Sequence, residues 1–89
     1  MEPSVYSDDF SRAFSGILEK TGVTCYQISG FAHLDQAYLS RLRSGEKTNP
    51  SPEAIVKICL AIAKFSEKAT IQDFELLFKS VGRSLRVTH

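Results

Sequence analysis

The sequence lacks the features of membrane, secreted and disulfide-linked proteins. It has no apolar run close to the roughly 20 residues that cross a bilayer, and its first residues lack the apolar segment of a secretory signal. We therefore expect a cytoplasmic protein that does not bind a membrane. The two cysteines, Cys25 and Cys59, fit no metal-ligand spacing and are too few for a disulfide scaffold. We expect both to be free thiols, with Cys59 buried.

Patterns typical of enzymes and of metal sites are also missing. The sequence shows no nucleophile paired with a base, no glycine-rich phosphate loop and no two carboxylates on one helix face. His33 and His89 have no partner at the spacing of metal ligands. We therefore expect neither an enzyme nor a bound metal or cofactor.

The net charge is low, with a formal value of +1 over 89 residues. A domain that binds DNA along one face usually carries a clear basic excess. The charges are unevenly distributed, however. Residues 1–23 hold four acidic and two basic residues, residues 36–50 three basic and one acidic, and residues 79–89 three basic and none acidic. This distribution permits DNA binding without establishing it.

Capping residues and apolar spacing predict five helices and almost no strand. The first helix is expected over about 8–20, with Ser7 as its N-cap and Gly22 closing its end. The second begins after Thr24, which forms a capping box with Gln27, and it is short.

The third and fourth helices have equally clear signals. Asp35 is the expected N-cap of the third, and Gly45 closes it. The fourth begins at Ser51, with Pro52 at its first helical position, and we expect it to be the most buried. Its predicted core positions are Ile55, Ile58, Cys59 and Ile62, on a face widened by Val56, Leu60 and Ala63.

The fifth helix is predicted over about 70–82. Thr70 and Asp73 provide its N-terminal capping pattern and Gly82 its end, followed by a basic tail that we expect to fray. Its apolar stripe either packs in the core or pairs two copies of the chain; the stripe consists of Phe74, Leu77, Phe78 and Val81. No linker divides the helices, so residues 1–89 are expected to form a single all-α domain, an orthogonal bundle.

Residues 24–45 have the spacing of a helix-turn-helix: a helix of about eight residues, a turn of three or four, and a helix of about nine. Five apolar residues are expected to pack this unit against the first and fourth helices: Ile28, Ala32, Leu34, Leu39 and Leu42. The outward positions of its second helix are then free for a partner. These positions are Gln36, Ala37, Tyr38, Ser40 and Arg41.

An extended register surrounds this unit. It consists of Gly22-Val23-Thr24, Gln27-Ile28-Ser29, Leu34-Asp35, Tyr38-Leu39-Ser40-Arg41-Leu42, Ser44-Gly45 and Asn49-Pro50-Ser51-Pro52-Glu53. In this register the sequence resembles the Cro/cI-type helix-turn-helix domain, or XRE family, over about residues 10–65. The resemblance implies a five-helix, lambda-repressor-like bundle with an extra C-terminal helix. It also implies a transcription regulator that binds double-stranded DNA as a homodimer.

The resemblance further implies which residues contact DNA. The first turns of the third helix would enter the major groove, with Gln36, Ala37, Tyr38 and Arg41 facing bases and Ser40 facing base or phosphate. Glutamine can pair with adenine and arginine with guanine, and the alanine methyl can meet that of thymine. The ring of Tyr38 could instead pack across the helix. Phosphate contacts are implied for Thr24, Cys25 and Gln27 and, in the loop after the third helix, for Lys47, Thr48 and Asn49.

Three residues depart from the family pattern: Ser29 replaces alanine, His33 replaces glycine and Arg43 replaces glutamate. Serine fits if its hydroxyl bonds to a carbonyl, and histidine tolerates a positive φ. Arg43 either contacts phosphate or pairs with Glu19. These departures and the low net charge favour an alternative to DNA binding, namely a protein-interaction module such as an antitoxin that keeps the fold and binds a protein partner.

Overall fold

Five helices and no strand make up the described part of the chain. The computed structural model describes the backbone of residues 4–87 and the side chains of residues 9–81. The helices are α1 (Ser4–Thr21), α2 (Cys25–Ala32), α3 (Gln36–Ser44), α4 (Pro52–Phe65) and α5 (Ile71–Val87). The prediction of an all-helical chain with five helices is therefore confirmed. Within residues 4–87, no helix is both long and apolar enough to cross a membrane.

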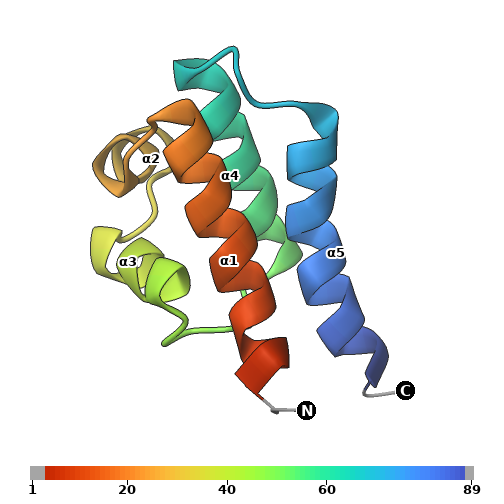
Figure 1. The fold of residues 1–89 in the computed structure, drawn as a ribbon. Helices are drawn as coiled ribbons and strands as arrows, with labels where there is room; N and C mark the ends of the chain where they lie inside the picture. Colours follow the sequence, from red (N-terminus) through yellow and green to blue (C-terminus); the bar gives the residue numbers. More distant parts are fainter. Residues whose placement is uncertain (1–3, 88–89) are drawn as a thin grey trace.

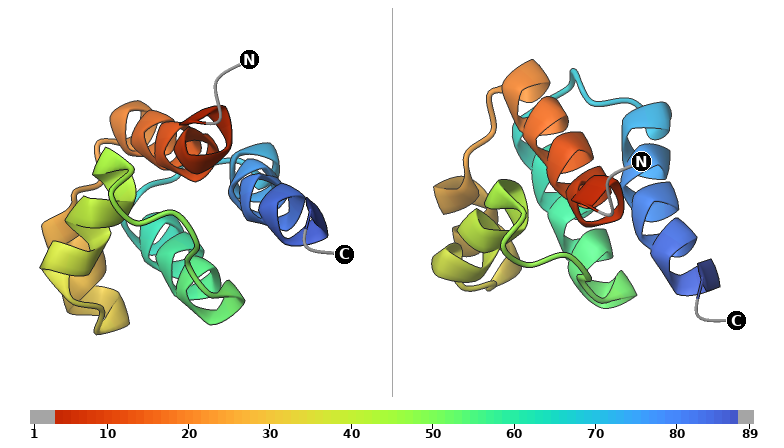
Figure 2. Two further views of the ribbon diagram at one scale, coloured as in Figure 1. Left: turned by 90° about the horizontal axis from the view of Figure 1, so that it is seen from below. Right: turned by 60° about the horizontal axis from the view of Figure 1, so that its bottom comes forward.

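The helices form two groups that share one core. Helices α1, α4 and α5 lie alongside one another, and the short helices α2 and α3 pack at one side of them (Figures 1 and 2). Helix α1 contacts both α5 and α3, whereas α2 contacts α4 and α3. The pair α2–α3 is therefore held from two sides, by α1 and by α4.

Apolar side chains from all five helices meet in this core. Four of the five apolar residues predicted to pack α2 and α3 are buried, and Leu34 is partly buried against them. The predicted core positions of α4 are also buried, and both cysteines are free thiols, with Cys59 buried. Burial raises the pKa of the Cys59 thiol to about 11. The core therefore follows the apolar periodicity of the sequence closely.

The prediction that Val56, Leu60 and Ala63 widen the buried face of α4 is wrong. Val56 is 45% and Leu60 58% exposed, and Ala63 is exposed as well. A helix buries only the side that faces its neighbours, and here Ala54 and Ala61 complete that side. The stripe of α5 is divided in a similar way. Leu77 and Val81 are buried and Phe74 is partly buried, but Phe78 is 40% exposed.

Two helix ends also differ from the sequence prediction. Helix α1 begins at Ser4, so Ser7 lies inside the helix and is not its N-cap. Helix α5 continues past Gly82 to Val87, so residues 83–87 are helical where a frayed tail was expected; residues 88–89 lie outside the described residues. A serine or glycine inside a helix costs only about 0.5–1 kcal/mol relative to alanine. Neither residue is enough to end a helix whose neighbours continue the pattern.

Candidate nucleic-acid interface

The start of α2 has the predicted capping box. The Gln27 backbone N–H donates to Thr24 Oγ1 at 3.1 Å, and the Thr24 N–H donates to Gln27 Oε1 at 3.0 Å. Within this first turn, the N–H groups of Cys25 and Tyr26 have no acceptor inside the helix. Free N–H groups and the helix dipole together favour an anion at this end. The free N–H of Cys25 therefore suits the phosphate contact predicted for this residue, whereas the backbone N–H groups of Thr24 and Gln27 are already bound within the capping box.

Arg43 of α3 lies close to this same helix start. Its charge acts on the thiol of Cys25, whose pKa is raised by burial and lowered to a smaller extent by the guanidinium. The Arg43 carbonyl accepts hydrogen bonds from the hydroxyls of Ser11 at 2.6 Å and Ser15 at 3.3 Å, which anchors the end of α3 to α1. No ion pair joins Arg43 to Glu19 among the side chains of residues 9–81. Pairing with Glu19, one of the two roles expected for Arg43, is therefore not observed.

The turn between α2 and α3 accommodates Ser29 and His33, the other two residues that depart from the family pattern. His33 adopts the left-handed conformation, with φ 59° and ψ 39°, and its N–H donates to the Ser29 carbonyl at 2.9 Å. The Ser29 hydroxyl donates to the Leu34 carbonyl at 2.6 Å. Both expectations, the positive φ of histidine and a serine–carbonyl bond, are confirmed. These two hydrogen bonds help to fix how α3 leaves α2.

Helix α3 presents one apolar and one polar side. Leu39 and Leu42 are fully buried, whereas the side away from the core is exposed. Four of the five predicted base-facing residues lie exposed on this helix: Gln36, Ala37, Ser40 and Arg41. Tyr38 differs from them, because it is partly buried against the core and lines a depression with Leu34 and Ala54. Burial raises the pKa of its hydroxyl.

Asp35 occupies the N-cap position of α3 but does not cap the helix. Its backbone is extended, with φ −64° and ψ 131°, yet its side chain makes no cap hydrogen bond. The prediction was therefore right about the position and wrong about the bond. A side-chain cap stabilises a helix by about 1 kcal/mol. Helix α3 forgoes this stabilisation and keeps an exposed carboxylate at its first turn.

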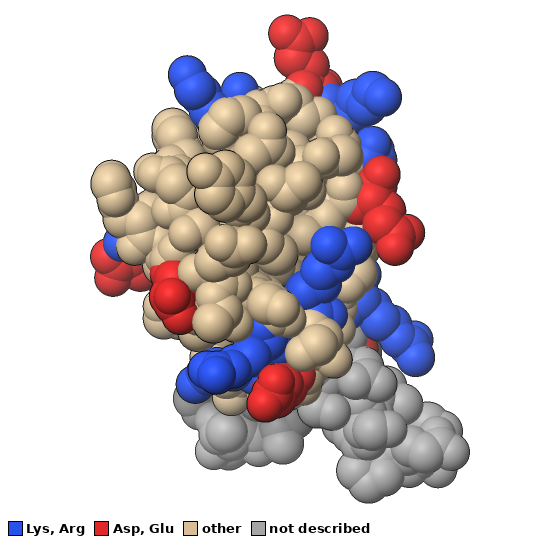
Figure 3. Space-filling model, turned by 90° about the vertical axis from the view of Figure 1, so that its left-hand side faces the viewer, with Lys and Arg blue, Asp and Glu red and all other residues tan. Residues whose placement is uncertain are grey.

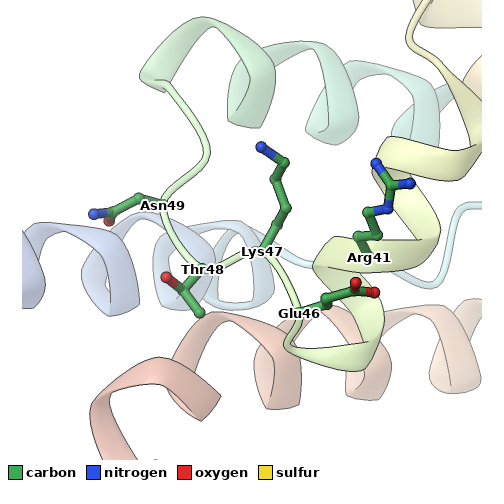
Figure 4. Close-up of a pocket in the computed structure, with 5 residues that line it drawn as sticks. All are labelled: Arg41, Glu46, Lys47, Thr48 and Asn49. Atoms are coloured by element: carbon green, nitrogen blue, oxygen red, sulfur yellow. The ribbon is translucent and has the colours of Figure 1, made fainter.

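The loop after α3 folds back onto the helix. The N–H groups of Gly45 and Lys47 both donate to the Arg41 carbonyl, at 3.1 and 3.0 Å, and Gly45 has the predicted left-handed conformation with φ 90°. This fold leaves a depression of about 460 Å³. Its lining residues are Arg41, Glu46, Lys47, Thr48 and Asn49 (Figure 4). Arg41 and Lys47 extend in the same direction, so their charges lie on one side of the loop.

The sequence had assigned Arg41 to bases and Lys47 to phosphate, without predicting that they share one depression. It also missed Glu46, which lines the same depression as Arg41 and Lys47 (Figure 4). The available signal was its place as the one acidic residue within 36–50. No ion pair joins Glu46 to Arg41 or Lys47 in the part of the chain whose side chains are described.

Basic residues are present in α3 and in the loop after it, at Arg41, Arg43 and Lys47. Helix α2 contains no charged residue. In Figure 3, the middle of the face that carries α2 and α3 is largely uncharged, and basic side chains lie both along its upper edge and in its lower part, where acidic side chains lie among them. Arg41, Arg43 and Lys47 form no ion pair with any side chain of residues 9–81. Within this described part, no carboxylate neutralises the three cations in a direct ion pair.

A second, apolar surface lies between α2 and α4. Phe31 and Phe65 are each 43% exposed, and their rings meet edge to face with centroids 6.2 Å apart. Leu60 lines a shallow depression of about 260 Å³ together with Phe31 and His33. Exposed apolar side chains that cluster in this way often mark an interaction surface.

Comparison of the chain with protein-family models, with curated proteins and with solved structures gives no match. The choice among possible functions therefore depends on the residues and the geometry described above.

Proposed function

We propose that this chain is a sequence-specific DNA-binding protein that regulates transcription. In this proposal α2 and α3 act as a helix-turn-helix of a lambda-repressor-like bundle, and α3 enters the major groove. The observation that carries the proposal is the exposed side of α3: cations in this helix and directly after it form no ion pair with the side chains of residues 9–81, and the helix itself is held against the core. The charge of Arg43 acts on Cys25 at the start of α2, and Arg41 and Lys47 line the depression after α3.

The exposed residues of α3 suit contacts with base edges. Gln36 can bond N6 and N7 of adenine, and Arg41 can bond O6 and N7 of guanine. Ala37 and Ser40 are small enough to let the helix approach the bases closely. Tyr38 is partly buried against the core, so less of its ring is exposed to a base than of the other four side chains.

Phosphates would bind on both sides of the groove. At the start of α2, where Arg43 adds a charge, the donors that the three predicted residues leave for phosphate are the Cys25 N–H and the side-chain NH2 of Gln27, because the Thr24 and Gln27 backbone N–H groups are bound within the capping box. Lys47, Thr48 and Asn49 offer a second set in the loop. Two such anchors orient a helix in the groove, because phosphate contacts determine its register without contributing sequence information.

We propose that the chain binds as a homodimer on a palindromic site. Helix α5 supports this, since Ile71, Leu76 and Phe78 are exposed on it to 75%, 54% and 40%. Two copies would place their α3 helices about one turn of DNA apart, roughly 34 Å.

The test is selection of bound sequences from a random DNA pool at low salt, with the oligomeric state measured on the same sample. We expect a palindromic sequence and an affinity that falls linearly with salt on a log–log scale, because bound phosphates release counterions. Absence of any DNA binding at low salt would refute the proposal.

The apolar surface of Phe31, Leu60 and Phe65 supports a second candidate function, a protein-interaction module of the antitoxin type. In this case a protein partner from the native cell would co-purify with the chain, and Leu60→Lys would release it. Arg41→Ala is the matched control, because Arg41 lies outside the apolar surface and its loss would leave that partner bound. DNA binding that survives Leu60→Lys would show that the two surfaces act independently.

A further inference from the structure

We infer that Asp35 determines sequence specificity, by selecting cytosine at one position of the DNA strand that α3 contacts. The inference rests on the proposed function and extends it to a residue that the sequence had assigned to helix capping. It starts from a contrast among the helix starts of this chain.

Three helix starts use a hydroxyl cap. Thr24 Oγ1 accepts from the Gln27 N–H at 3.1 Å, Ser51 Oγ from the Ala54 N–H at 3.1 Å, and Thr70 Oγ1 from the Asp73 N–H at 3.2 Å. Among the four helices whose N-cap residue is described, α3 is the exception, although aspartate is among the best N-cap residues. Departures from such helix-capping preferences are most often found at residues of functional sites.

The carboxylate of Asp35 is also free of other partners. It is exposed, and it makes neither a hydrogen bond nor an ion pair with the side chains of residues 9–81. It lies next to Gln36, at the end of α3 that would enter the groove. A group near the bases with no internal partner is available to bind one of them.

Only some base edges suit a carboxylate. An ionised carboxylate accepts hydrogen bonds and cannot donate them. In the major groove, cytosine offers the N4 amino group, whereas guanine and thymine offer oxygen acceptors that would repel the carboxylate. Adenine offers an amino group beside the N7 acceptor, so it fits less well. Asp35 therefore favours cytosine and disfavours guanine and thymine at the base that it faces. It attracts the correct base and repels two of the wrong ones, and both effects contribute to specificity.

A second carboxylate, that of Glu46, allows base selection by Asp35 to be distinguished from a general effect of negative charge on DNA affinity. Glu46 lies at the other end of α3, in the depression with Arg41 and Lys47. Its charge opposes phosphate there, and its removal should strengthen binding to all sequences alike. Glu67, exposed in the connection between α4 and α5, provides a remote control with the same change of charge.

The experiment compares the full-length wild type with Asp35→Asn, Glu46→Gln and Glu67→Gln. Each is titrated with the selected DNA and with all single-base variants of its half-site. For Asp35→Asn we expect the preference for cytosine to fall about tenfold at one position and to shift toward adenine, which an amide binds well. Glu46→Gln should raise affinity uniformly, and Glu67→Gln should change nothing. Because asparagine is about as good an N-cap residue as aspartate, Asp35→Asn should change the melting temperature little.

The inference would be overturned if Asp35→Asn raised affinity uniformly, as Glu46→Gln is expected to, or if it left every base preference unchanged. Either result would leave the proposed function standing, because the wild type would still bind its selected DNA. A wild type that bound no DNA would overturn both.

Discussion

Two aspartates at helix starts have opposite roles in this molecule. Asp73, in the first turn of α5, accepts hydrogen bonds from the Thr70 N–H at 2.9 Å and from Nζ of Lys20 at 2.7 Å. Asp35, at the start of α3, makes no side-chain cap bond. The first carboxylate joins α5 to α1, whereas the second is exposed to solvent. The α1–α5 contact therefore uses its charges within the fold, whereas the carboxylate at the start of α3 faces solvent, where the proposed function places DNA.

The largest expected effect tests the proposed contact between the exposed side of α3 and DNA. Arg41→Ala should weaken binding to the selected DNA by about 1–3 kcal/mol and relax specificity at one base position. Its melting temperature should stay that of the wild type, because the guanidinium makes no ion pair within the described side chains. Titration with single-base variants of the site measures this. An equal loss on every sequence would identify Arg41 as a phosphate contact.

The next effect tests how much the Asp73 contacts between α5 and α1 stabilise the fold. Asp73→Ala removes one half of a capping box and the ion pair to Lys20, so the free energy of unfolding should fall by about 1 kcal/mol. DNA binding by the folded protein should not change. Urea denaturation measures the loss. Asp35→Ala is the matched control and should cost clearly less, and equal losses for the two variants would contradict the comparison.

Lys47→Ala should weaken binding to all DNA sequences by a similar factor. Lys47 lines the depression beside Arg41, and its proposed contact is with phosphate. We expect a modest loss of affinity shared by all sequences, and a salt dependence whose log–log slope falls by about one. Binding measured at several salt concentrations provides the slope. A loss confined to the selected sequence would instead assign Lys47 to a base.

The smallest expected effect depends on pH. The hydrogen bond from Lys20 and that from the Thr70 N–H hold the pKa of Asp73 below its ordinary value. Since the folded-state pKa is lowered, this carboxylate stabilises the fold fully above its unfolded pKa, about 3.9. The contribution is lost as the pH falls through the folded value.

The difference in stability between the wild type and Asp73→Asn should therefore be constant near neutral pH and shrink in acid below about pH 4. Thermal unfolding at a series of pH values measures this difference. A difference that persists undiminished in acid would show that the charge of Asp73 does not contribute.

Much of the fold could be predicted because it depends on residues close together in the chain. The box of Thr24 and Gln27, the left-handed His33 and Gly45, and the start of α4 at Ser51 all involve partners within a few residues. Apolar spacing likewise predicted the buried leucines of α3. The errors at Ser7 and Gly82 arose because such local preferences are weak, about 1 kcal/mol or less, and neighbouring residues can override them.

The candidate site could be predicted less completely. The sequence indicated which residues of α3 point outward, and the structure finds four of the five exposed. It did not indicate that Arg43 lies beside Cys25, that Arg41 and Lys47 share a depression, or that Asp35 leaves its helix uncapped. Each of these depends on how two elements meet, and local patterns carry no information about that.

The sequence by itself therefore determined the number and kind of the elements, most of their ends and most of the core, because capping and helical periodicity act over one or two turns. The tertiary structure decided which polar groups remain free. Lys20 and Asp73 meet across 53 positions of the chain, and Val56 and Leu60 are exposed because α2 and α5 do not cover them. Such outcomes depend on which helices pack together. Packing joins residues that are far apart in the chain, and local sequence patterns extend over only one or two helical turns.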